Sequence, residues 1–155
     1  MDSIDKRLLV EMVLSELNKR IREAEEQLFE ILRRANEAPG AMQSHSDTDK
    51  NLYGRQAAGQ KESVDILKQE RVALGAVLFG ATPAISIGSL VETRDGSEAL
   101  WYFILPGGSG ITIKGSVGDI TVVAPHTPLG SVLVGKKPGE TIGVGKRILT
   151  IVGVH

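Results

Sequence analysis

A regular repeat of apolar residues limits the folds open to this chain more than any other feature of its sequence. The repeat advances by alternating steps of four and three residues, through Val10, Leu14, Leu17, Ile21, Ala24, Leu28, Ile31 and Ala35. This spacing forms one apolar stripe along an α-helix and is typical of the seam of a coiled coil. The sequence therefore predicts a long helix that needs a second helix packed against it.

A second, weaker stripe follows the same alternation later in the chain, through Tyr53, Ala57, Gln60, Val64, Leu67, Arg71, Leu74 and Leu78. Gln60 and Arg71 weaken this seam because both are polar. Pro39 and Gly40 end the first helix, since proline cannot continue the helical hydrogen bonding and glycine takes turn conformations. We therefore predict an antiparallel helical hairpin over residues 1–79, with its tip at about 38–50 and a loop at 38–49.

The composition changes near residue 80. Residues 80–155 contain five of the six prolines, most of the 18 glycines and many Val and Ile, which favours strands and turns. We expect a hairpin turn at Asp95-Gly96, strands at 99–105, 111–114, 119–124, 140–144 and 147–154, and a short helix at 128–134 capped by Thr127. With Pro83 marking a linker at 80–84, the predicted fold class is α+β: an N-terminal antiparallel coiled-coil hairpin followed by a β-rich domain at 85–155.

Composition excludes several classes of protein. The chain has no cysteine, which rules out disulfides and thiolate zinc sites, and its net charge of −1 lacks the basic excess of a nucleic-acid binder. No segment approaches the roughly 20 apolar residues of a membrane span, and the N-terminal segment lacks the apolar run of a signal sequence. We expect a cytoplasmic monomer that does not bind a membrane.

Two carboxylates draw attention in the polar stretch SHSDTDKN at 44–51. Asp47 and Asp49 lie between the two helical patterns, far from any predicted core. One interpretation is that they cap the second helix. The other is that the tip presents them to another molecule. His45 beside them does not complete the ligand set of a tight metal site.

The first helical segment also carries basic residues interleaved with glutamates. Such alternation predicts a solvated helix face rich in ion pairs. The alternative is that these residues line a path toward RNA or toward a channel in a partner. The basic residues concerned are Lys19, Arg20, Arg22, Arg33 and Arg34.

Taken together, the two halves resemble the bacterial Gre transcript-cleavage factors. The match rests on the helical hairpin, ISIGSLVE (85–92), the WYFI strand and ITVVAPHTPLGSVLVGKKPGE (120–140). The resemblance implies an FKBP-like domain at 85–155 that binds core RNA polymerase, and a hairpin that enters the secondary channel of that enzyme. It implies polymerase contacts at Thr127, Pro128, Leu129 and Gly130.

The same resemblance gives the tip a role. It implies that Asp47 and Asp49 act as catalytic carboxylates that help to hold Mg²⁺ at the polymerase active centre, close to the nascent RNA. The chain would need no cofactor of its own and would be an accessory factor rather than an enzyme. The cleaving members of the family carry a glutamate where this chain has Lys50. Two forms therefore stay open: a factor that modulates transcript cleavage or elongation, and a channel-binding regulator without cleavage activity.

Two alternatives belong to other functional classes. An FKBP-type prolyl isomerase would need an aromatic-lined pocket, whereas Trp101, Tyr102 and Phe103 are consecutive on one predicted strand and alternate between its faces. A coiled-coil scaffold would assemble through its seam, which Gln60 and Arg71 disfavour.

Overall fold

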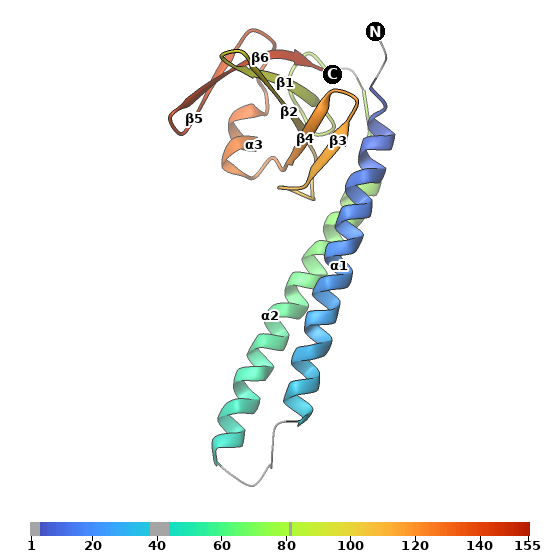
Figure 1. The fold of residues 1–155 in the computed structure, drawn as a ribbon, viewed down its shortest axis with the longest axis vertical. Coiled ribbons are helices and arrows are strands. Elements are labelled where there is room, and N and C mark those ends of the chain that lie inside the picture. The colour runs from blue at the N-terminus through green and yellow to red at the C-terminus, as the bar shows by residue number, and fades with distance from the viewer. Residues whose placement is uncertain (1–3, 38–43, 81) are drawn as a thin grey trace. The chain divides into compact units, whose positions relative to one another are not determined.

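The structure is a computed structural model that describes residues 4–37, 44–80 and 82–155, with the backbone alone for 44–51. Two long helices come first, followed by strands and one short helix (Figure 1). The predicted α+β class, with an N-terminal antiparallel helical hairpin before a β-rich part, is confirmed. The elements are α1 (Lys6–Glu37), α2 (Ser44–Gly75), β1 (Leu90–Asp95), β2 (Glu98–Ile104), β3 (Thr112–Gly115), β4 (Gly118–Val123), α3 (Pro128–Leu133), β5 (Thr141–Val144) and β6 (Arg147–Val154).

The chain divides into two compact units. One, here called the arm, is Leu17–Gln69; the other, here called the sheet unit, combines Met1–Glu16 with Glu70–His155. The sheet unit thus takes in residues of both long helices on the N-terminal side of the linker expected at 80–84. That linker stays a prediction.

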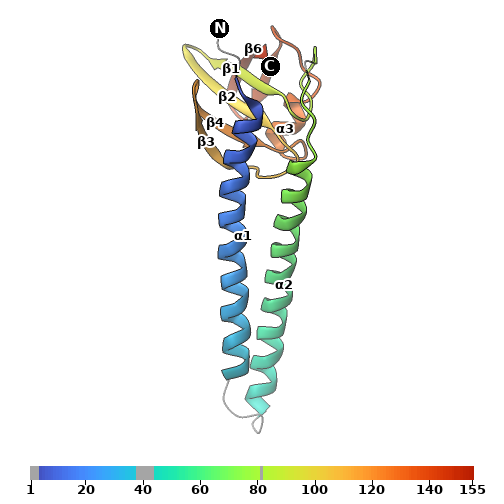
Figure 2. The same ribbon diagram turned by 90° about the vertical axis from the view of Figure 1, so that its right-hand side faces the viewer.

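Within the arm, α1 and α2 run side by side in opposite directions (Figure 2). Leu17, Ile21 and Val64 are buried along the seam, as the apolar spacing predicts. Gln60 also lies on the seam, and its Nε2 donates a hydrogen bond of 2.9 Å to the carbonyl oxygen of Ala24. The polar head of Gln60 is therefore satisfied inside the helix pair, so it weakens the seam less than its polarity suggests.

The ends of the long helices differ in part from expectation. α1 begins where the Asp5 carboxylate accepts hydrogen bonds from the backbone N–H groups of Arg7 and Leu8, at 3.1 and 3.2 Å. These bonds satisfy two of the donors that a helix start leaves without partners. α2 ends at Gly75, and Leu78 is 89% exposed. The extension of the second seam to Leu78 is therefore wrong.

The strands form one six-stranded sheet in the order β3-β4-β2-β1-β6-β5. β2 is central, as its apolar sequence predicts, and pairs antiparallel with β1 and parallel with β4. In the β1–β2 hairpin Asp95 lies opposite Glu98, which leaves Gly96 and Ser97 as the turn. Gly96 has a φ of 61°, a conformation that favours glycine. The expected hairpin is confirmed, with its turn one residue later than predicted.

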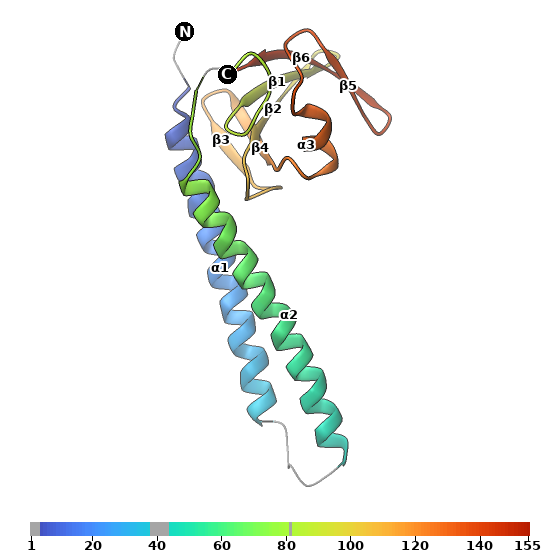
Figure 3. The same cartoon turned by 180° about the vertical axis from the view of Figure 1, so that it is seen from behind.

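Both faces of the sheet are covered within the sheet unit. α3 lies beside one face (Figure 3), where Leu133 joins a buried cluster that includes Ile104 and Ile151. On the other face, the rings of Phe79 and Phe103 lie 6.2 Å apart. A Cβ on Gly108 would lie 3.0 Å from Val13 Cγ1, so this glycine allows α1 to approach the β2–β3 connection closely. These contacts hold α3 and the first turns of α1 against the sheet.

Candidate functional site

Asp47 and Asp49 lie on a helix rather than in the loop between the two long helices. α1 ends at Glu37 and α2 begins at Ser44, so the loop expected at 38–49 is too long at its C-terminal end. The hairpin tip at about 38–50 stays a prediction. Asp47 is the fourth residue of α2 and Asp49 the sixth. Neither occupies the N-cap position, which precedes the first helical residue, so the structure gives no support to capping by these two aspartates.

The positions of the two aspartates bear on the predicted Mg²⁺ site. Residues two apart on an α-helix are about 200° apart around its axis and do not share a face. The catalytic and metal roles of Asp47 and Asp49 stay predictions, since their side chains, like that of His45, lie outside what the structure describes. Among the described side chains, no group of three or more His, Cys, Asp or Glu could hold a metal ion.

The TPLG turn forms the start of α3. Thr127 is the N-cap: its Oγ1 accepts a hydrogen bond of 3.1 Å from the backbone N–H of Gly130 and donates one of 2.7 Å to the carbonyl oxygen of Ala124. Pro128 follows at the first helical position, where its missing N–H has no cost. The predicted short helix with a Thr127 cap is confirmed, and it ends one residue earlier than expected, at Leu133.

Gly130 sits where no other residue fits. A Cβ at this position would lie 1.9 Å from the carbonyl oxygen of Ala124 and 3.0 Å from Pro125 Cα, both backbone atoms. The preceding backbone and α3 can approach this closely only because the side chain is absent. Gly130 is buried and Leu129 packs against the core, whereas Pro128 is exposed. Of the four predicted polymerase contacts, Pro128 is therefore the most accessible, and Leu129 and Gly130 chiefly support the turn.

A groove of about 380 Å³ lies beside this turn, between α3 and β5. None of the four predicted contact residues lines it. Val134, at the end of α3, is 40% exposed and adds an apolar surface, and Lys136 adds a charge. Sequence reasoning missed the groove because its other wall belongs to a strand that comes later in the chain. The lining residues are Ser131, Val132, Val134, Lys136, Thr141, Ile142 and Gly143.

Two of the basic residues on the arm are paired with glutamates of the same helix. Arg34 Nε lies 3.4 Å from a carboxylate oxygen of Glu30, and Arg33 hydrogen-bonds the same carboxylate and that of Glu37. The hydrogen bonds from Arg33 lower the pKa of Glu30, and Glu30 in turn raises the pKa of Arg33. The predicted solvated, ion-paired face is confirmed for Arg33 and Arg34. Lys19, Arg20 and Arg22 are also exposed.

Comparison with known proteins adds little to this geometry. No protein family matches the chain, and no curated protein matches it. Among solved structures, the chain is similar to the GreA factor homolog 1 (Gfh1) protein of Thermus thermophilus, at 19% identity and a TM-score of 0.40, over 92% of this chain and 94% of that one.

Two further structures give similar values. A structure described as the transcription factor Gfh1 matches at 20% identity and a TM-score of 0.39, over 92% of each chain. Gfh1 of Thermus aquaticus matches at 20% identity and a TM-score of 0.38, over 91% of this chain and 92% of that one. Similarities this distant do not establish a function.

In the part of the chain that the structure describes, no helix is both long enough and apolar enough to cross a membrane.

Proposed function

We propose that this chain is a Gre-like transcription factor that binds core RNA polymerase and inserts its helical hairpin into the secondary channel of that enzyme. The observation that carries the proposal is the hairpin itself. Its two helices have 32 residues each, about 48 Å at 1.5 Å per residue. Within the arm, Leu17, Ile21 and Val64 are buried where the two helices pack against each other. In this proposal the two paired helices enter the channel together.

In this proposal the tip acts on the active centre of the polymerase, in the cytoplasm and close to the nascent RNA. Mg²⁺ keeps several waters and often takes only one or two protein carboxylates. A second Mg²⁺ in such a centre lowers the pKa of the attacking water and stabilises the leaving oxygen. Because residues two apart on an α-helix do not share a face, the proposal assigns a single aspartate, Asp47 or Asp49, as the ligand in the cleaving form. The chain is then an accessory factor, with no cofactor of its own.

Lys50 favours the second form of the same proposal. It introduces a positive charge one residue from Asp49 and three from Asp47, and a cation close to Mg²⁺ opposes metal binding. In that form the hairpin occupies the channel and excludes other factors without promoting cleavage. Cleavage assays on stalled, backtracked polymerase with Asp47→Ala and Asp49→Ala separate the two forms. Loss of cleavage in one variant identifies the ligand, whereas no cleavage by the unaltered chain favours the regulator.

The sheet unit supplies the polymerase-binding surface in this proposal. The residues proposed for this surface are exposed Pro128 at the start of α3 and two residues that line the groove between α3 and β5, apolar Val134 and charged Lys136. The Thr127 cap and the tight packing at Gly130 hold α3 in one position. A rigid support of this kind reduces the ordering cost of binding.

A tethered cleavage reagent tests the proposal directly, because the chain has no cysteine and accepts a single one at a chosen site. Ser46→Cys places an iron chelate near the tip, and Ser97→Cys places it on the exposed β1–β2 turn as a matched control. We expect hydroxyl radicals from position 46 to cut the nascent RNA near its 3′ end in stalled complexes, and those from position 97 not to do so. Equal cutting from both sites, or none from either, contradicts insertion of the hairpin.

Neither alternative function gains a supporting observation. The groove between α3 and β5 has no aromatic lining, and Phe103 is fully buried, so neither supplies the aromatic-lined pocket of a prolyl isomerase. For a scaffold, the seam residues Leu17 and Ile21 are already buried within one chain and are not available for assembly.

A further inference from the structure

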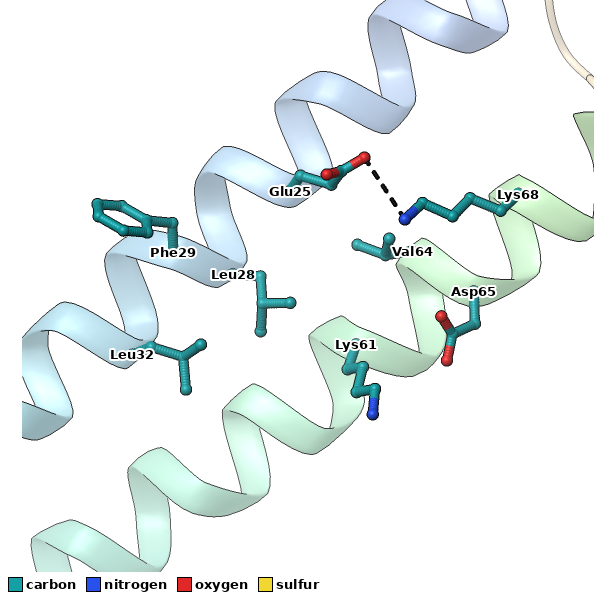
Figure 4. A pocket seen from close by; sticks show the side chains of 8 residues that line it. All are labelled: Glu25, Leu28, Phe29, Leu32, Lys61, Val64, Asp65 and Lys68. Carbon is teal, nitrogen blue, oxygen red and sulfur yellow. Dashed lines mark ion pairs between the residues drawn. The ribbon is translucent and has the colours of Figure 1, made fainter.

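A groove of about 330 Å³ lies along the arm, between α1 and α2 (Figure 4). α1 contributes Leu28, Phe29 and Leu32 to it, and α2 contributes Val64 at its base. Phe29 is 70% exposed and Leu32 is 46% exposed, and both lie next to the seam of α1 rather than on it. Exposed large apolar side chains that lie together mark a site of interaction more often than isolated ones do.

The charges around this groove are balanced within the arm. Lys68 Nζ lies 3.8 Å from Glu25 Oε1 across the groove (Figure 4). The other two charged lining residues, Lys61 and Asp65, have opposite signs and are four positions apart on α2. The lining therefore has no net charge.

Four charged residues that follow Phe29 on α1 are also paired with one another. Glu30 binds Arg33 and Arg34, and Arg33 Nη1 lies 3.2 Å from Glu37. A groove whose lining has no net charge does not attract RNA phosphates, whose binding depends on neutralisation by Lys and Arg. It also offers no complement to an acidic peptide. The occupant that fits the groove is an uncharged, apolar protein surface.

The size of the groove argues against a second copy of this chain as the occupant. At 70% exposure, the Phe29 ring offers about 100–170 Å², whereas a stable interface buries about 800 Å² on each partner. The volume lies at the lower end of the roughly 300–1,000 Å³ typical of binding pockets. A contact this small suits one or two apolar side chains of a partner that is held by a larger interface elsewhere.

We propose that Phe29 and Leu32 receive an apolar side chain from the wall of the polymerase secondary channel and so fix the depth to which the arm enters. This inference rests on the proposed function. Phe29 lies eight residues before the end of α1, about 12 Å along the helix axis, so the contact falls behind the tip. The small contact adds to the affinity of the sheet unit because both act within one complex.

Binding of fluorescently labelled full-length chain to core RNA polymerase tests this inference. We expect Phe29→Ala to weaken binding about tenfold and Leu32→Ala by several-fold, because each removes apolar surface buried in the complex. Leu8→Ala is the matched control, since Leu8 is 55% exposed on the same helix but lies outside the arm. We expect it to bind within about twofold of the unaltered chain. Circular dichroism of each variant checks that its helices are retained.

The remaining outcomes contradict either the groove contact or the proposed function on which it rests, and the experiment distinguishes the two. If the unaltered chain binds polymerase and Phe29→Ala binds equally well, the groove contact is wrong and the proposed function stands. If the unaltered chain does not bind polymerase, the proposed function fails and this inference fails with it. If light scattering shows a dimer that Phe29→Ala dissociates, the occupant is a second copy, and the channel contact is wrong.

Discussion

Replacing Gly130 with alanine tests how the TPLG turn supports the candidate polymerase-binding surface. The new Cβ would lie 1.9 Å from the carbonyl oxygen of Ala124 and 2.8 Å from its carbonyl carbon. Both are backbone atoms, so no side-chain rotation relieves the clash. α3 must instead move by more than 1 Å to reach the 3.0 Å below which real Cβ atoms show essentially no contacts.

The cost of that movement follows from what α3 holds in place. Leu133 is fully buried in the core, and overpacking at such a site costs about 1–3 kcal/mol. The shift also disturbs the Thr127 cap, and losing a cap costs about 1 kcal/mol. We therefore predict a loss of about 2–4 kcal/mol in the free energy of unfolding, a large fraction of the roughly 5–15 kcal/mol of a typical domain.

Urea unfolding monitored by Trp101 fluorescence measures this loss, because Trp101 is the only tryptophan and lies on β2. The control is Gly143→Ala: a Cβ there meets nothing within 4 Å, and we expect a change within about 0.5 kcal/mol. A Gly130→Ala variant as stable as this control would refute the packing argument.

Three further predictions concern the helices. Gly59→Ala should stabilise the chain by about 0.5–1 kcal/mol in thermal unfolding, since Gly59 is exposed within α2 with nothing within 4 Å of a new Cβ; a loss of stability would contradict this. Thr127→Ala should lower the free energy of unfolding by about 1 kcal/mol in urea, while Thr127→Ser, which keeps the hydroxyl, should change it little; equal effects would exclude the cap. Arg33 lowers the pKa of Glu30, so the stabilisation from this pair is present above the ordinary pKa of a glutamate and is lost as the pH falls through the lowered pKa. Helicity by circular dichroism should therefore decrease on acidification, and Glu30→Gln should decrease less; identical titrations would contradict the assignment.

The local features of the fold could be predicted because each depends on neighbouring residues. The spacing of apolar residues around Leu17 and Ile21 predicts the helix pair, since burial follows directly from helical periodicity. The Thr127-Pro128 sequence predicts the start of α3, because capping needs only a hydroxyl three residues before a free N–H.

Features that depend on distant contacts could not be predicted. The parallel pairing of β2 with β4 joins strands that are not consecutive in the chain, and no local pattern encodes it. The same holds for the hydrogen bond from Gln60 to the carbonyl oxygen of Ala24. This bond gives the polar side chain a partner on the seam, so Gln60 destabilises the helix pair less than its polarity suggests. The local sequence does not predict the start of α2 at Ser44. Ser and Asp favour caps and turns, so SHSDTDKN has the composition of a loop.

The candidate site also combines local features that the sequence predicts with features that depend on distant contacts. The resemblance implies polymerase contacts at Thr127, Pro128, Leu129 and Gly130. The structure adds that Pro128 is exposed whereas Gly130 is buried, a difference that the sequence does not predict. The groove between α3 and β5 and the groove that contains Phe29 could not be predicted from the sequence. Each is lined by two elements that are distant in the chain, so each is visible only in the folded structure.

Direct binding to core RNA polymerase, measured in competition with a transcript-cleavage factor, tests the central claim most directly. The account predicts a saturable complex in which this chain and the cleavage factor displace each other, because both occupy the secondary channel. No association with core polymerase, or association that leaves the cleavage factor bound, would contradict it.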